Sequence, residues 1–282
     1  MKYRQLLGGL SPEEFLKSYW QKKPLLIRQA FPGFVSPISK DEMLELSMSD
    51  DAASRLVIEE SGENNWQVRQ GPFTKKELKS LPDSHWTVLV QEVNAHHEKT
   101  AELLDWFSFI PNWRVDDIMV SYAVDKGGVG PHTDNYDVFL IQGLGKRRWK
   151  INYTPVEEEH LVEDLDIRIL SDFTADEEWV LEPGDMLYLP PKIAHYGIAE
   201  GECMTLSIGF RTPSHREILI GVPTFLLEYI PENHFYTDRW LRVSSTGSMC
   251  PTRSRPASRR GSSGVTSARR RSRSTTGRRT GT

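Results

Sequence analysis

A histidine and an aspartate two residues apart, His132 and Asp134, lie in a glycine-rich stretch over 127–137. Imidazole nitrogens and carboxylate oxygens both ligate divalent transition metals, so a neighbouring His and Asp can hold one ion together. If this stretch is a strand, alternate residues point the same way, and Tyr136 shares the face of His132 and Asp134. The pattern predicts two ligands of a metal site whose third ligand comes from elsewhere in the chain.

The candidate for that third ligand is His195, which follows a Glu-Pro-Gly-Asp turn, a short apolar run and a Pro-Pro bend over 182–191. We expect these features to place His195 at the start of a strand. Two histidines and one carboxylate on one face of an octahedron leave three positions open, which is the arrangement of non-haem Fe(II) oxygenases. A catalytic zinc site with the same three ligands is the alternative.

The elements that must position these residues change in character along the chain. From about residue 114 onward, short β-rich runs alternate with Gly- and Pro-rich turns, which favours a mainly β sandwich or barrel. Before them, the sequence predicts capped helices at Ser11 and Ser39 and paired strands over 55–59 and 66–69. The remaining expected elements are strands over 25–28, 118–124, 136–142, 148–152, 179–181, 186–189 and 204–210, a strand from residue 86 leading into a helix over 98–107, and a helix over 214–229.

Four stretches together resemble a known family. Besides the two motifs around the predicted ligands, they are Trp-Gln-Lys-Lys-Pro-Leu-Leu from Trp20 and Ser-Ile-Gly-Phe-Arg from Ser207. These stretches are similar to those of the cupin-like JmjC ribosomal oxygenases, specifically the bacterial arginine 3-hydroxylases of large-subunit ribosomal protein uL16. The resemblance covers the chain from about residue 20 to about residue 238.

The resemblance implies a double-stranded β-helix, Fe(II), 2-oxoglutarate and O2 as co-substrates, and hydroxylation of an arginine at Cβ. The family's metal ligands fall on His132, Asp134 and His195. We therefore expect N-terminal helices and strands over 1–110 that pack on the barrel, and a JmjC/cupin catalytic core over 111–212. The start of a helical dimerisation region is expected over 213–238, with a homodimer only if that short region suffices.

The co-substrate 2-oxoglutarate carries a distal carboxylate, which a guanidinium can bind through two parallel hydrogen bonds. The Lys-Arg-Arg-Trp-Lys run over 146–150 offers several cations, and strand alternation alone does not single one out. The resemblance assigns this role to Arg147. We expect Ser121 and Thr205 to donate their hydroxyl groups to the same carboxylate.

A guanidinium substrate needs an anion and flat or apolar walls. Asp117, Met119 and Ser121 alternate along one predicted strand, so Asp117 would meet the guanidinium while Met119 lines its aliphatic stem. The resemblance adds Tyr136 and Ser207 to the same arginine pocket. A cap at the start of the strand is the alternative role of Asp117.

The formal net charge of −4 hides two unlike parts of the chain. Residues 239–282 contain 12 Arg and no Asp or Glu, whereas residues 1–238 carry 23 basic and 39 acidic groups, a net charge of −16. An acidic body attracts basic partners such as ribosomal proteins and disfavours direct binding of nucleic acid. We interpret 239–282 as a disordered Arg/Ser-rich tail. Its basic residues are all Arg, whereas residues 1–238 use both Lys and Arg, and translation in a shifted reading frame would also produce such a change.

The sequence contains no apolar stretch of about eighteen residues, which argues against a transmembrane span. Its first ten residues lack the apolar core of a signal peptide. The two cysteines, Cys203 and Cys250, form no disulfide framework and fit a reducing compartment. We therefore expect a cytoplasmic protein.

Three other functions are compatible with the same residues. A JmjC-type hydroxylase of another residue or target, such as a His or Asn, would share the metal ligands and differ only in its substrate pocket. A zinc or manganese cupin that acts on a small molecule would share the barrel. A non-catalytic RNA- or ribosome-binding protein would act through the Arg-rich segment 239–282.

Overall fold

The computed structural model describes residues 2–60, 65–233 and 235. The interpretation of 239–282 as a disordered tail lies outside these residues. The chain divides into two compact units, Met1–Pro223 and Thr224–Thr282, and the whole sheet belongs to the first of them. None of the helices in the described part of the chain has the length and apolarity that crossing a membrane requires.

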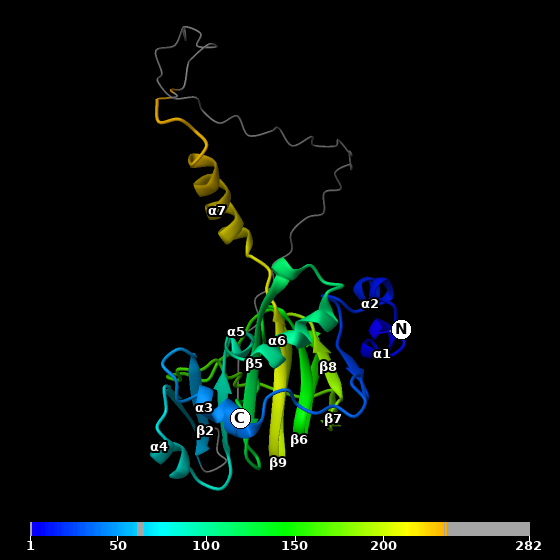
Figure 1. Ribbon diagram of the computed structural model, residues 1–282, viewed down its shortest axis with the longest axis vertical. Helices are drawn as coiled ribbons and strands as arrows, with labels where there is room; N and C mark the ends of the chain where they lie inside the picture. The colour runs from blue at the N-terminus through cyan, green and yellow to red at the C-terminus, as the bar shows by residue number, and fades with distance from the viewer. Residues whose placement is uncertain (1, 61–64, 234, 236–282) are drawn as a thin grey trace, which may run out of the picture. The chain divides into compact units, whose positions relative to one another are not determined.

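The strands of the first unit form one antiparallel sheet in the order β1-β8-β6-β9-β5-β4-β2-β3, with β7 pairing with β6 (Figure 1). This arrangement confirms the prediction of a mainly β fold. The strands are β1 (Leu25–Ile27), β2 (Ser54–Glu60), β3 (Asn65–Gln70), β4 (Trp86–Val90), β5 (Val115–Ala123), β6 (Asp137–Pro155), β7 (Glu177–Leu181), β8 (Met186–Leu189) and β9 (Ile193–Phe210).

Two long strands, β6 and β9, pair with each other and form the centre of the sheet. The runs 136–142 and 148–152 were expected as separate strands, but residues 137–142 and 148–152 both belong to β6, and 204–210 is only the last part of β9. The pairing register shifts on either side of Leu144, where the chain carries Gly143 and Gly145. A Cβ on Gly145 would lie 1.9 Å from the carbonyl oxygen of Glu202, so only glycine lets the strand bend here instead of ending in a turn.

Short helices precede and interrupt the strands. As predicted, capped helices follow Ser11 and Ser39. Both begin with a capping box, in which the serine hydroxyl accepts from the backbone N–H of a glutamate three residues on. The helix expected over 98–107 is divided into α6 and a 3-10 turn, η1. The bounds are α1 (Lys2–Leu6), α2 (Pro12–Ser18), α3 (Lys40–Leu46), α4 (Lys75–Lys79), α5 (Val93–His96), α6 (Glu98–Ala101), η1 (Glu102–Phe107), η2 (Asn112–Arg114) and α7 (His215–Leu227), which contains Pro223.

An aromatic cluster packs the helical segments onto one face of the sheet. The ring centroid of Phe15 in α2 lies 4.9 Å from that of Tyr188 in β8 and 5.7 Å from that of Phe139 in β6. Phe107 of η1 also contacts Phe139, with ring centroids 4.8 Å apart. Burial of these rings stabilises the main core on this face. Residues at alternate positions of the same strands are thereby directed to the opposite face, which carries the candidate site.

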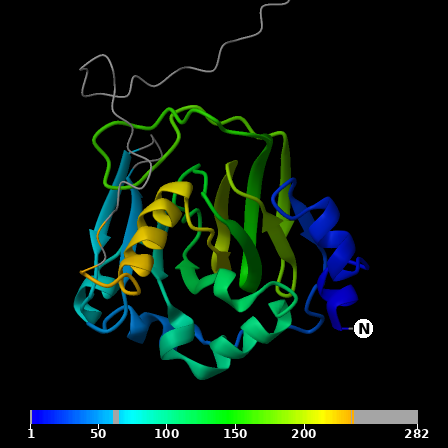
Figure 2. The same ribbon diagram turned by 90° about the horizontal axis from the view of Figure 1, so that it is seen from above.

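The segment between β6 and β7, residues 156–176, crosses toward the β2–β3 hairpin (Figure 2). Its Ile169 is buried in one cluster with Val57 of β2. Near its start, the Glu159 carboxylate accepts a hydrogen bond from the Thr133 hydroxyl. The segment therefore packs beside the loop that carries His132 and Asp134.

Candidate metal centre

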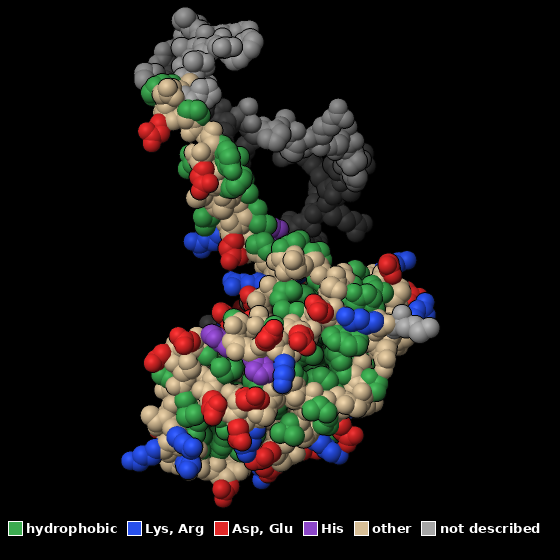
Figure 3. All heavy atoms as spheres, in the orientation of Figure 1, with side chains coloured by type: hydrophobic (Ala, Val, Ile, Leu, Met, Phe, Trp, Pro, Cys, Tyr) green, Lys and Arg blue, Asp and Glu red, His purple; other side chains and the backbone are tan. Residues whose placement is uncertain are grey.

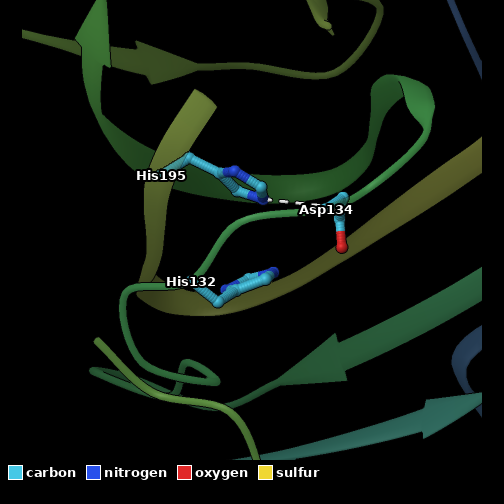
Figure 4. Close-up of side chains that lie close together, drawn as sticks. All are labelled: His132, Asp134 and His195. Carbon is cyan, nitrogen blue, oxygen red and sulfur yellow. Dashed lines mark ion pairs between the residues drawn. The ribbon is translucent and has the colours of Figure 1, made fainter. Parts of the chain in front are cut away.

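Three side chains that are distant in the sequence converge in space. The ligand atoms of His132, Asp134 and His195 all lie within 4.8 Å of one another (Figure 4). The His195 Nε2 lies 3.6 Å from the Asp134 Oδ2, and the two imidazole centroids are 4.3 Å apart. Among the described residues, this is the only group of three or more His, Cys, Asp or Glu side chains with that geometry.

Backbone pairing sets the positions of both histidines. His132 and His195 form an isolated antiparallel bridge. Each imidazole is then oriented by a carbonyl, because the Nδ1 of His132 lies 3.0 Å from the Gly130 oxygen and the Nδ1 of His195 lies 2.9 Å from the Ile193 oxygen. A carbonyl oxygen only accepts hydrogen bonds, so each Nδ1 carries the proton and each Nε2 presents its lone pair.

The expectation that His132, Asp134 and Tyr136 alternate along a strand is wrong. Only His132 takes part in a bridge, and β6 begins after Tyr136. Asp134 lies on a loop, and its carbonyl accepts a 2.7 Å hydrogen bond from the backbone N–H of Lys192, which has a φ of +67°. That hydrogen bond, and not a continuous β-sheet ladder, holds the loop against the Pro-Pro bend. The loop still brings the side chains of His132 and Asp134 close enough together to bind one metal ion.

Burial determines the ionisation of His195, which is 2% exposed. Loss of solvent and the neighbouring His132 lower the pKa of His195 to about 4, although Asp134 acts in the opposite direction. The imidazole is therefore neutral near pH 7, and a neutral imidazole is the form that ligates a metal.

An inner cavity of about 90 Å³ opens onto these ligands and is also lined by the three predicted co-substrate residues, Arg147, Ser121 and Thr205. Arg147 is 3% exposed and its Nε donates to the Cys203 Sγ at 3.4 Å, but its Nη2 is buried without a partner. The Thr205 hydroxyl donates to the Gln142 Oε1 at 3.1 Å. A buried guanidinium with an unsatisfied donor fits an anionic ligand in this cavity.

A second, outer cavity of about 270 Å³ is lined by the four predicted substrate residues, Asp117, Met119, Tyr136 and Ser207. Met119 and Ser207 are direct cross-strand partners on β5 and β9. The last three of these residues line the inner cavity as well, so the two cavities adjoin. Burial raises the pKa of Asp117 above its ordinary value, while its Oδ2 accepts a 2.9 Å hydrogen bond from the Glu92 N–H.

Arg55 was not anticipated from the sequence as a residue of these cavities. Arg55 of β2 lines both the inner and the outer cavity. The alternation of side chains along β2 could have indicated its position in part. Leu56 and Ile58 belong to the main core, whereas Val57 packs in the cluster on the opposite face of the sheet. Arg55 shares the face of Val57 by the same alternation.

Comparison with known proteins adds independent findings. Residues 102–218 match the model of the JmjC domain family. The chain is 41% identical over 225 residues to the ribosomal protein uL16 3-hydroxylase of Escherichia coli, which covers 80% of this chain and 59% of that protein. It is 41% identical over 216 residues to a probable ribosomal oxygenase of Haemophilus influenzae, covering 76% of this chain and 52% of that protein.

A solved structure shows the same fold. The ribosomal oxygenase YcfD of Escherichia coli, in complex with cobalt and 2-oxoglutarate, superposes with a TM-score of 0.74 at 38% identity, covering 86% of this chain and 63% of that chain. This match confirms the expected JmjC/cupin fold. The chain spans between half and three fifths of the length of the Escherichia coli and Haemophilus influenzae relatives.

Proposed function

Because residues 102–218 belong to the JmjC domain family and the chain has the fold of a ribosomal oxygenase, we propose that it is an Fe(II)- and 2-oxoglutarate-dependent protein hydroxylase. Its proposed target is the Cβ of an arginine in a large-subunit ribosomal protein. One observation carries the proposal: a His–Asp–His cluster shares a cavity with a buried arginine that has an unpartnered donor.

The residues present fit both the metal and the co-substrate. Two imidazole nitrogens and one carboxylate are the facial ligand set of non-haem Fe(II) oxygenases, and His132, Asp134 and His195 would hold the ion. The free Nη2 of Arg147 would bind the distal carboxylate of 2-oxoglutarate. When bound, Fe(II) and 2-oxoglutarate together activate O2, which yields succinate, CO2 and a hydroxylated C–H bond.

The chain's own contribution is positioning and exclusion of water. The carbonyls of Gly130 and Ile193 keep both imidazoles in the tautomer that ligates through Nε2. Arg147, which is 3% exposed and lines the inner cavity, would fix the orientation of the co-substrate. Such fixed geometry decides which C–H bond of a substrate lies close enough to react.

The outer cavity is the proposed binding site of the substrate arginine. Asp117 would accept hydrogen bonds from the guanidinium, Met119 and Tyr136 would line its aliphatic stem, and Ser207 would contribute a hydroxyl. Acidic side chains are spread over the face of the first unit seen in Figure 3, in keeping with the net charge of −16 over 1–238. Such a surface favours encounter with a basic ribosomal protein.

Turnover and product analysis test this proposal. The purified chain with Fe(II), 2-oxoglutarate and the host's uL16 should form succinate and one hydroxylated arginine, located by tandem mass spectrometry. Asp134→Ala should abolish both, and the matched variant Asp172→Ala, at an exposed carboxylate, should not. Hydroxylation of a histidine or asparagine, or turnover that depends on zinc or manganese without 2-oxoglutarate, would replace this proposal with one of the alternatives.

A further inference from the structure

Arg55 is a half-buried cation that lines both cavities, next to Tyr136. Five residues line both cavities, and Arg55 is the only charged one among them; the others are Met119, Tyr136, Val138 and Ser207. Its Nε is buried without a partner, and it forms no ion pair with a carboxylate of the described residues. A guanidinium carries five N–H donors and no acceptor, so the unpartnered Nε of Arg55 can donate to an oxygen atom of a ligand in these cavities.

The sheet register places Arg55 in one row with the proposed co-substrate residues. Arg55 is paired with Leu89 of β4, Leu89 with Ser121 of β5, and Ser121 with Thr205 of β9. Cross-strand partners project from the same face of a sheet. Arg55 therefore lies two strands away from Ser121, toward the outer cavity and away from Arg147.

The charges around the outer cavity limit the kinds of chemical group that Arg55 could bind. A substrate guanidinium that pairs with Asp117 brings a second positive charge into the cavity that Arg55 lines. The other cation of this cavity, Arg211, already lies 3.5 Å from the Glu217 carboxylate. The distal carboxylate of the co-substrate has Arg147 as its partner. The remaining hydrogen-bond acceptors that every basic polypeptide substrate offers, whatever its sequence, are its main-chain carbonyl oxygens.

We propose that Arg55 binds a main-chain carbonyl of the substrate next to the hydroxylated residue, and so acts as a specificity-determining residue. The inference rests on the proposed function, because it takes the outer cavity as the substrate site. With the guanidinium at Asp117 and the main chain at Arg55, the substrate side chain is held at both ends. Because Cβ is the side-chain atom next to the main chain, the contact at Arg55 controls its approach to the metal centre.

The test uses a capped, arginine-containing peptide of the host's uL16 that lacks Asp and Glu, so that carbonyls are its only strong acceptors. Arg55→Met should raise the KM for this peptide about 10- to 100-fold, the loss expected for a hydrogen bond to a charged donor. The hydroxylated peptide formed per succinate should fall, whereas the KM for 2-oxoglutarate should change far less. Arg55→Lys, which retains a donor, should recover part of the loss.

Arg69→Met is the matched control, because Arg69 lies on the neighbouring strand β3, is exposed and lines neither cavity. It should behave as the wild type, and melting temperatures should agree among all variants. An unchanged peptide KM in Arg55→Met, or a rise confined to the KM for 2-oxoglutarate, would overturn the inference.

Calorimetric binding of the same peptide to the Mn(II)-loaded protein separates the two proposals. Peptide binding that is lost in Arg55→Met without any succinate formation by the wild type supports Arg55 and overturns the proposed activity. A wild-type protein that neither forms succinate nor binds the peptide overturns both.

Discussion

The backbones of His132 and His195 hold each other through a reciprocal pair of hydrogen bonds. The N–H of His132 donates to the His195 carbonyl at 3.0 Å, and the N–H of His195 donates to the His132 carbonyl at 2.9 Å. Neither bond involves a side chain or a metal. The two proposed ligands are therefore brought together by the fold itself, which makes the site preorganised for an ion.

This backbone bridge predicts that His132→Ala folds but does not bind metal. In the wild type, saturating Fe(II) or Mn(II) should raise the melting temperature, since a ligand at 100 times its Kd adds about 2.7 kcal/mol to the free energy of unfolding. In His132→Ala the metal-free melting temperature should stay near that of the wild type, and the increase with metal should disappear. A full metal-induced increase in this variant would contradict the assignment of His132 as a ligand.

Arg147 and Arg148 offer a matched pair for testing co-substrate binding. Arg147 is buried with a free Nη2, whereas Arg148 lies on the surface, 2.5 Å from Glu200 and 3.4 Å from Glu178. Arg147→Met should raise the KM for 2-oxoglutarate about 10- to 100-fold, because a charge-assisted pair is lost. Arg148→Met should leave it unchanged. Equal effects of the two substitutions would show that the distal carboxylate does not bind Arg147.

Residue chemistry and spacing predicted the candidate site better than they predicted the backbone that forms it. His132 and Asp134 are close in sequence, and His195 follows a recognisable turn and bend, so their types alone indicate a metal site. The backbone that positions these ligands consists of a β-bridge at His132 and a loop at Asp134. Both are held by hydrogen bonds to residues about sixty positions later in the chain, and local hydrophobic periodicity carries no information about such contacts.

The bend of β6 and the role of Arg55 were missed for a related reason. Gly145 reads as a turn residue in sequence, and only the close carbonyl of Glu202 shows that it permits a bend within a continuous strand. A single arginine in an alternating strand reads as solvent-facing. The face of Arg55 becomes an interior wall only because segment 156–176 packs against Val57 on that side of the sheet.

The raised pKa of Asp117 predicts a pH-dependent affinity for substrate. Burial is the main cause of the raised value, so the free carboxyl takes up its proton above its ordinary range near 3.8. Only the ionised form attracts a guanidinium, so the KM for an arginine peptide should be constant at neutral pH and rise as the pH falls toward that raised pKa. Below the pKa the rise should approach tenfold per pH unit.

Asp117→Asn should have a high peptide KM that no longer changes over this range. The KM for 2-oxoglutarate, measured in the same samples, reports pH effects that arise elsewhere in the site. A wild-type peptide KM with the same pH profile as Asp117→Asn would remove Asp117 from the substrate site.

Asp185 should be a major contributor to stability because it joins the N-terminal segment to the turn before β8. Its side chain is 4% exposed and accepts hydrogen bonds from Arg28 at 2.6 Å, from the Gln29 N–H at 2.9 Å and from the Glu182 N–H at 3.1 Å. Although burial alone raises the pKa of Asp185, the Gln29 N–H and the Arg28 guanidinium hold it below its ordinary value. The stabilisation is therefore fully present above the unfolded-state pKa and is lost as the pH falls through the folded-state pKa.

Asp185→Ala should lower the free energy of unfolding by about 2–4 kcal/mol near neutral pH, because it removes the buried acceptor of the Gln29 N–H, the Glu182 N–H and the Arg28 guanidinium. Urea denaturation of the metal-free protein measures this loss, and the difference from the wild type should shrink once the pH drops below the ordinary aspartate pKa of about 3.9. Asp172→Ala, at a side chain that is 82% exposed, should change the stability far less at either pH. A difference between wild type and Asp185→Ala that persists undiminished in acid would mean that the lost stability comes from packing and not from the ionised carboxylate.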